Sequence, residues 1–114
     1  MNNIILIGMP GVGKSCIGVV LAKSLGMSFI DSDIVIQEQL GSRLSEIIAR
    51  DGREGFLRLE DEINAALAPE NCVIATGGSA VFGEKAMAHF RQIGQIVYLA
   101  IDCAALAERL GDLD

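Results

Sequence analysis

Four short apolar runs are spaced along the chain, and each of them predicts a buried β-strand. Each run is four residues long, which is too short for a helix, and none alternates as a strand with one solvated face would. Continuous runs of this kind are typical of parallel strands covered by helices on both faces. The predicted strands are Ile4–Ile7, Met27–Ile30, Cys72–Ala75 and Ile96–Leu99.

Between these runs, apolar residues recur at helical spacing. The clearest helix is Lys14–Leu25, and Gly26 marks its end. Its apolar face is expected to contain Ile17, Val20, Leu21 and Leu25. Further helices are predicted at Asp33–Leu40, Leu44–Arg50, about Glu54 to Leu67, Glu84–Gln92 and Cys103–Leu110. Alternating strands and helices predict a three-layer α/β fold, in which a parallel sheet is flanked by helices and ligands bind beyond the carboxyl ends of the strands.

The length and composition fit one domain over residues 1–114. A chain of 114 residues is too short for a second core. Hydrophobic residues make up 51% and aromatic residues only 4%, so we expect an aliphatic core. The net charge of -6 argues against a nucleic-acid partner, because phosphate backbones are bound by basic surfaces.

The cysteines and the N-terminal residues indicate a compartment. Cys16, Cys72 and Cys103 show no paired or metal-binding spacing, which is typical of free thiols in a reducing environment. The chain begins without the basic segment of a signal peptide, and no apolar run approaches the ~18 residues of a membrane span. We therefore expect a cytoplasmic protein with no membrane partner.

The strongest chemical signal is the segment Gly8–Ser15, which matches the phosphate-binding P-loop pattern of Gly, four residues, Gly, Lys and Ser. It follows a predicted strand and opens a predicted helix, as the mechanism requires. Backbone N–H groups of such a loop, together with the helix N-terminus, bind phosphate. Lys14 is expected to reach the β- and γ-phosphates of ATP, and the Ser15 hydroxyl to bind Mg²⁺.

Cys16 follows this loop in the first helical turn. One interpretation is a thiol made acidic by the helix N-terminus and open to oxidation. The other is a small buried packing residue, which we favour because free cysteines are usually buried.

Two aspartates follow the second predicted strand. Asp31 and Asp33 can face one pocket if the backbone between them stays extended. One of them could order the Mg²⁺ shell, and the other could orient or deprotonate an attacking hydroxyl; the leading hypothesis gives the first role to Asp31 and the second to Asp33. The alternative is that Asp33 is an ordinary N-cap of the helix that begins near Ile34. The neighbouring P-loop favours the functional interpretation.

Other candidate residues carry weaker signals. Thr76–Ser79 ends the third strand, and its two glycines would allow a ligand close to the backbone or simply a turn. His89 has no metal-binding spacing and is expected to be a solvated helix residue, as are Lys85 and Arg91.

Taken together, these motifs resemble those of the shikimate kinase family over essentially the whole chain. The resemblance places nucleotide binding on Gly11–Cys16, that is Gly11, Val12, Gly13, Lys14, Ser15 and Cys16, with Arg109 against the adenine. It matches Asp31 and Asp33 to the family's Asp-x-Asp, whose second aspartate binds a shikimate hydroxyl and is the candidate base. Gly77 and Gly78 match the family's shikimate-binding glycines. The implied fold is a five-stranded parallel sheet.

The chain departs from the family pattern at several positions. The segment Phe-Arg-x-x-Glu is Phe56-Leu57-Arg58-Leu59-Glu60 here, so Leu57 replaces the arginine expected to bind the shikimate carboxylate. Arg58 is the fallback anion contact, although one helical step turns a side chain by ~100°. Ser79 stands for a third glycine and Cys16 for a threonine. The chain also ends before the expected lid arginine and last strand.

The function implied by the resemblance is ATP- and Mg²⁺-dependent phosphorylation of shikimate to shikimate 3-phosphate, in aromatic amino acid biosynthesis. Lys14 and Asp33 are the expected catalytic residues. Two alternatives remain open: a P-loop kinase for another small hydroxylated metabolite, which Leu57 and Ser79 motivate, and a nucleotide-binding module without catalysis.

Overall fold

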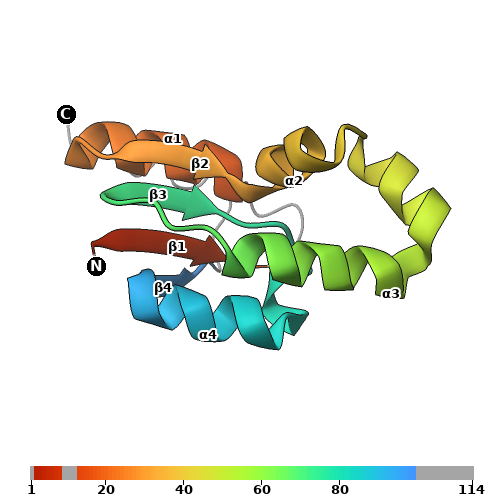
Figure 1. Cartoon of the computed structure of the whole chain (residues 1–114). Coiled ribbons are helices and arrows are strands. Elements are labelled where there is room, and N and C mark those ends of the chain that lie inside the picture. The colour runs from red at the N-terminus through yellow and green to blue at the C-terminus, as the bar shows by residue number, and fades with distance from the viewer. Residues whose placement is uncertain (1, 9–12, 100–114) are drawn as a thin grey trace.

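The computed structural model describes residues 2–8 and 13–99, and this part of the chain forms a parallel sheet with helices on both faces (Figure 1). The strands are β1 (Asn3–Ile7), β2 (Ser28–Asp31), β3 (Cys72–Ala75) and β4 (Gly94–Tyr98). The helices are α1 (Lys14–Leu25), α2 (Ser32–Leu40), α3 (Leu44–Ala65), the short 3-10 helix η1 (Ala80–Phe82) and α4 (Glu84–Ile93). The predicted three-layer α/β fold is confirmed, while the predicted helix Cys103–Leu110 lies outside the described residues.

The order of the strands creates a switch point in the sheet. The order is β2-β3-β1-β4, and every neighbouring pair is parallel. From β1 the chain crosses through α1 to β2 on one side, whereas from β3 it crosses through α4 to β4 on the other. The carboxyl ends of β1 and β3 therefore border a crevice where ligands of such sheets bind.

Side chains that alternate along the two central strands build a core on each face of the sheet. Ile5 and Ile7 pack with Ile74 against the α4 side chains Ala86, Phe90 and Ile93. Leu6 and Val73 point to the opposite face and pack against the α1 side chains Ile17 and Ala22. The sheet is thus anchored from both faces, which fixes the positions of the loops that leave β1 and β3.

Strand burial separates the central strands from the edge strands. The prediction of buried strands is confirmed for β1 and β3, which lie in the middle of the described sheet. It was wrong for β2 and β4, whose residues are half-buried or exposed because each strand has only one neighbour in the described sheet.

The predicted apolar face of α1 also needs correction. Val20 and Leu25 are 37% and 53% exposed, so the buried face turns away from them. It is formed instead by Ile17, Gly18 and Ala22, with Leu21 partly buried beside them. Gly18 lets Phe29 of β2 approach, since a Cβ on Gly18 would lie 2.5 Å from the Phe29 ring. The helix pattern was right, but close packing through a glycine shifted the buried face.

The two predicted helices Leu44–Arg50 and Glu54 to Leu67 form one bent element, α3. Its kink is at Gly52, with φ 75° and ψ 172°, a conformation that is essentially restricted to glycine. In Figure 1 the two arms of α3 diverge at this bend, and the second arm runs beside α4. A third apolar cluster, formed by Ile36, Ile47, Phe56 and Ile63, joins α2 to both arms. The bend therefore sets the direction of the arm that begins at residue 53.

A buried asparagine connects the starts of the strands. The Asn3 side chain donates to the carbonyl oxygens of Pro69 at 2.8 Å and Ile93 at 2.9 Å, and it accepts from the Cys72 amide at 2.9 Å. Asn3 is only 2% exposed. Its amide thus satisfies backbone groups that would otherwise be buried without partners.

Helix α4 contains the one histidine of the chain. His89 was expected to be solvated, but it is half-buried and its ring Nε2 contacts the Leu67 carbonyl oxygen. The prediction was wrong because the segment after α3 packs on this side of α4. Lys85 and Arg91 are exposed, as predicted. Within residues 2–8 and 13–99, no helix is long and apolar enough to cross a membrane.

Candidate phosphate and acceptor site

The carboxyl ends of the central strands form the floor of the candidate site. Thr76, just after β3, donates both its amide, at 3.2 Å, and its hydroxyl, at 2.8 Å, to the Leu6 carbonyl oxygen of β1. On the β1 side the chain enters α1 through Gly13, which has φ 81° and ψ 35° and offers no side chain to cap the helix. Helix α1 therefore begins without a side-chain cap, as do many helices whose N-termini bind anions.

Lys14 begins α1 and is buried, with only 8% of its surface exposed. Its Nζ donates to the Gly8 carbonyl oxygen at 2.9 Å, which links the two described ends of the P-loop. Burial lowers the pKa of Lys14, and the neighbouring charge of Asp33 opposes that shift. The lysine side chain is thus held at the end of β1.

Ser15 and Asp31 are brought together by the packing of α1 beside β2. The Ser15 hydroxyl donates to Asp31 Oδ2 at 2.7 Å, and Asp31 Oδ1 accepts from the Asp33 amide at 3.0 Å. Asp31 is therefore the N-cap of α2. The alternative interpretation of the sequence had given that role to Asp33. The helix begins at Ser32 rather than near Ile34, so the backbone is not extended between the two aspartates.

Asp33 lies in the first turn of α2 and contacts the glycine loop after β3. An ideal Cβ on Gly77 would be 2.6 Å from Asp33 Oδ1 and 3.1 Å from Oδ2. The pKa of Asp33 is raised, mainly by burial and further by the charge of Asp31, while Lys14 acts in the opposite direction. A carboxyl group with a raised pKa accepts a proton more readily, which suits a general base.

These residues enclose a cavity of about 300 Å³, which we name the polar cavity. It is lined by Gly13, Lys14, Ser15, Cys16, Asp33, Thr76, Gly77 and Gly78. Seven residues that the sequence assigned to nucleotide, metal or acceptor binding therefore line one space: Gly13, Lys14, Ser15, Cys16, Asp33, Gly77 and Gly78.

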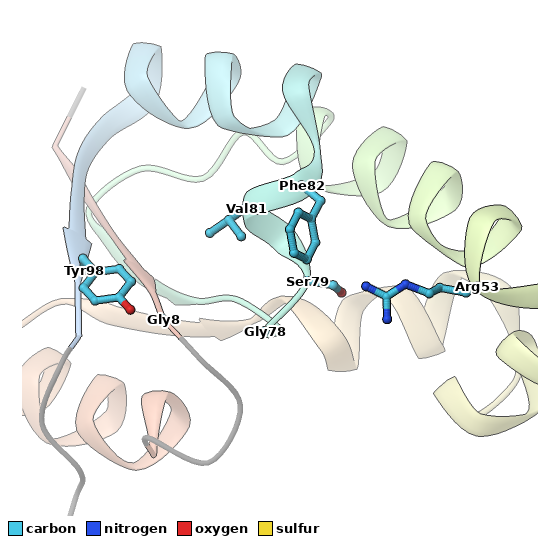
Figure 2. Close-up of a pocket in the computed structure, with 7 residues that line it drawn as sticks. All are labelled: Gly8, Arg53, Gly78, Ser79, Val81, Phe82 and Tyr98. Atoms are coloured by element: carbon cyan, nitrogen blue, oxygen red, sulfur yellow. The ribbon is translucent and has the colours of Figure 1, made fainter.

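A second cavity, of about 330 Å³, adjoins the first at Gly78, and we name it the apolar cavity. It is lined by Gly8, Arg53, Gly78, Ser79, Val81, Phe82 and Tyr98. Figure 2 shows Val81 and Phe82 of η1 on one side, Tyr98 at the end of β4, and the Arg53 side chain extending from α3 toward Ser79. Gly78 is common to both linings, so a group bound in one cavity lies next to the other.

A buried carboxyl group supports the wall of this cavity. Glu60 of α3 is 2% exposed, and its two oxygens lie 2.9 and 3.0 Å from the Ser79 hydroxyl, which donates to them. The pKa of Glu60 is raised, chiefly by burial, although the Ser79 hydrogen bond opposes the shift. Sequence reasoning missed Glu60 as a site residue and assigned no role to Arg53, Phe82 or Tyr98. Arg53 and Glu60 are seven residues apart, which places them on one face of a helix, and this spacing was the signal in the sequence that could have linked them to one site.

The remaining residues singled out from the sequence are Arg58, the cysteines and three residues outside the described part. Arg58 is exposed on α3 and lines neither cavity. Cys16 is exposed and lines the polar cavity, so its interpretation as a buried packing residue was wrong. Its sulfur is disulfide-bonded, so the free-thiol prediction failed there, whereas Cys72 is free and buried. Gly11, Val12 and Arg109 lie outside the described residues.

The donors around Ser15 fit a magnesium ion. Mg²⁺ prefers oxygen ligands and usually takes only one or two from the protein, with waters and substrate phosphates completing its shell. A hydroxyl and a carboxylate that lie 2.7 Å apart beside the phosphate-binding turn provide such a set. No group of three or more His, Cys, Asp or Glu side chains suited to a metal occurs in the described residues, so an all-protein cage is not formed by them.

A P-loop sequence that follows β1 at the switch point of a parallel sheet, with a buried lysine and a serine–aspartate pair at the start of α1, defines a P-loop α/β protein. Residues 10–114 match the family model described as shikimate kinase. The chain therefore belongs to the shikimate kinase family, and the resemblance seen in its motifs is confirmed.

Individual relatives agree with this assignment. The chain is 42% identical over 112 residues to shikimate kinase 2 of Yersinia enterocolitica, covering 97% of this chain and 64% of that protein. It is 39% identical over 108 residues to the shikimate kinase of Symbiobacterium thermophilum, covering 94% of this chain and 62% of that protein. The chain thus spans somewhat less than two thirds of these relatives.

Solved structures show the same fold. Shikimate kinase from Aquifex aeolicus superposes with a TM-score of 0.78 at 34% identity, covering 90% of this chain and 62% of that one. Shikimate kinase from Acinetobacter baumannii in complex with shikimate superposes with a TM-score of 0.81 at 35% identity, covering 87% of this chain and 56% of that one.

Proposed function

We propose that the chain transfers the γ-phosphoryl group of ATP to a hydroxyl group of shikimate, with Mg²⁺ as the metal ion. Membership of the shikimate kinase family supports the reaction, and the relative solved with shikimate supports the acceptor. The observation that carries the proposal is the junction of the two cavities at Gly78. The polar cavity is suited to phosphate, and the apolar cavity is suited to a small carbon ring.

Lys14 and the turn that precedes it bind the phosphates in this proposal. The Lys14 ammonium group has three donors, of which one bonds the Gly8 carbonyl oxygen at 2.9 Å. Because Lys14 is buried, its contact with phosphate oxygens would be little screened by water. A bound phosphate would also offset the burial that lowers the pKa of Lys14.

Asp33 acts on the acceptor hydroxyl at the junction. Its carboxylate accepts the hydroxyl proton as the acceptor oxygen bonds to the γ-phosphorus and the bond to the ADP oxygen breaks. The contact with Gly77 and the helical position hold this carboxylate in one place. Ser15 and Asp31 are the residues that would hold Mg²⁺, which neutralises phosphate charge when it is bound.

The test is a coupled ADP-release assay with Mg-ATP, with and without shikimate. We expect shikimate-dependent turnover that is lost in Lys14→Ala and strongly reduced in Asp33→Ala. ADP release that does not depend on shikimate, in a protein that still binds nucleotide, would exclude shikimate as the acceptor. An Asp33→Ala variant with full turnover would exclude the proposed role of Asp33.

A further inference from the structure

Among the described residues, one cationic side chain lines the apolar cavity, and no part of the proposed mechanism uses it. Arg53 is exposed and lines the cavity, and its guanidinium group extends toward Ser79 (Figure 2). Within residues 2–8 and 13–99 it forms no hydrogen bond or ion pair. The neighbouring Asp51 does not neutralise it, because both Asp51 oxygens accept from Arg50, at 3.1 and 3.0 Å.

The helical geometry of α3 brings this arginine to the acceptor side. Arg53, Leu57 and Glu60 follow the spacing i, i+4 and i+7, so they lie on one face of the arm that begins after Gly52. Glu60 of this face bonds Ser79, which identifies the face that meets the glycine loop. Leu57 packs against the apolar cluster of α2 and α3 and offers no charge. Arg53 lies one turn, about 6 Å, from Leu57 along the helix, a distance that an arginine side chain spans.

Arg58 does not share this position. It is one residue beyond Leu57, so its side chain is turned by about 100° around the helix. It is exposed and lines neither cavity. Among the lysines and arginines of the described residues, only Lys14 lines the polar cavity and only Arg53 lines the apolar cavity. The chain has a net charge of -6, and in its described part these two side chains supply the positive charge that lines the cavities for an anionic ligand.

We propose that Arg53 binds the carboxylate group of the acceptor and thereby determines the preference of the apolar cavity for an anionic hydroxy acid. This inference rests on the proposed function for the identity of the acceptor. The guanidinium group forms charge-assisted hydrogen bonds with the carboxylate at one end of the cavity. The ring packs against Val81 and Phe82, and the hydroxyl groups point toward Gly78 and Asp33. Arg53 is thus a binding residue that takes the place of a cation at position 57.

The experiment compares two probes, shikimate with its charged carboxylate and its methyl ester, in which that group is neutral. Both are titrated into the 114-residue chain while two-dimensional NMR spectra report the dissociation constants, which needs no turnover. The variants are Arg53→Leu, Arg53→Lys and Arg58→Leu, with Arg91→Leu as the matched control because Arg91 is an exposed helical arginine that lines neither cavity. Thermal unfolding of each variant establishes that it is folded.

The wild-type chain and Arg91→Leu are expected to bind shikimate about 10- to 100-fold more tightly than the ester, the value of one charge-assisted hydrogen bond. Arg53→Leu should bind the two probes equally, Arg53→Lys should retain part of the preference, and Arg58→Leu should retain all of it. A preference that survives in Arg53→Leu, or is lost in Arg58→Leu, overturns the inference and leaves the proposed function standing. A wild-type chain that binds neither probe overturns both.

Discussion

Replacing Gly77 by alanine tests the junction between the two cavities. The added Cβ would lie 2.6 Å from Asp33 Oδ1, about 0.8 Å short of the 3.4 Å at which ordinary van der Waals contact begins. The Asp33 carboxylate is short and belongs to the first turn of α2, so it must shift by a large part of that distance. A displacement of ~1 Å in a reacting group can reduce a rate by about 100-fold. We therefore expect Gly77→Ala to lower kcat by about 10- to 100-fold.

The matched control is Gly83→Ala. A Cβ on Gly83 would collide with Asp61 in the same way, but Asp61 accepts the Ala86 amide at 2.7 Å and lines neither cavity. Losing this cap at the start of α4 costs about 1 kcal/mol of stability. Gly83→Ala should thus lower the melting temperature and leave kcat within about twofold of wild type.

Steady-state ADP release and thermal unfolding, measured on both variants, separate the two effects. If Gly77→Ala retains wild-type kcat, or if both variants lose activity in proportion to their loss of stability, then the position of Asp33 against Gly77 does not control catalysis.

Three further substitutions test the fold and its electrostatics. Because its pKa is raised above the ordinary 3.8, Asp33 favours folding most in its protonated form, and stability is lost as the pH rises through the folded-state pKa. Asp33→Asn should therefore be more stable than wild type at pH 8 and less dependent on pH in chemical denaturation; an unchanged pH slope would contradict this. Gly52→Ala should lower the free energy of unfolding by about 1–3 kcal/mol, since Gly52 has φ 75° and ψ 172°, and an equally stable variant would show that the kink is not strained. Asn3→Ala leaves three backbone groups without partners and should cost about 3 kcal/mol in urea unfolding; a cost below 1 kcal/mol would mean that water replaces the amide.

Much of the fold followed from local pattern. The bounds of α1 and β3 agree with the prediction, because Gly26 ends the helix and the strand is a continuous apolar run. The joining of two predicted helices into α3 did not follow, because a helix assignment across Gly52 depends on a conformation that only the backbone reveals. Edge and central strands could not be separated either, since their order in the sheet is set by long-range contacts.

In the candidate site, too, some residues could be predicted from the sequence and others could not. The P-loop spacing predicted Lys14 and Ser15 because that chemistry depends on residues adjacent in sequence. The contacts of Asp33 with Gly77 and of Glu60 with Ser79 join segments 44 and 19 residues apart, so no local pattern contains them. For the same reason the sequence pointed to Arg58 as the fallback anion contact, whereas the position of Arg53 in the lining of the apolar cavity is visible only in the structure.

The proposed phosphoryl transfer is tested most directly by a ³¹P NMR time course of the chain with Mg-ATP and shikimate. We expect a new phosphomonoester resonance that grows in step with ADP and does not form in Lys14→Ala. ADP that accumulates with inorganic phosphate alone, or a spectrum of ATP that does not change, would contradict it.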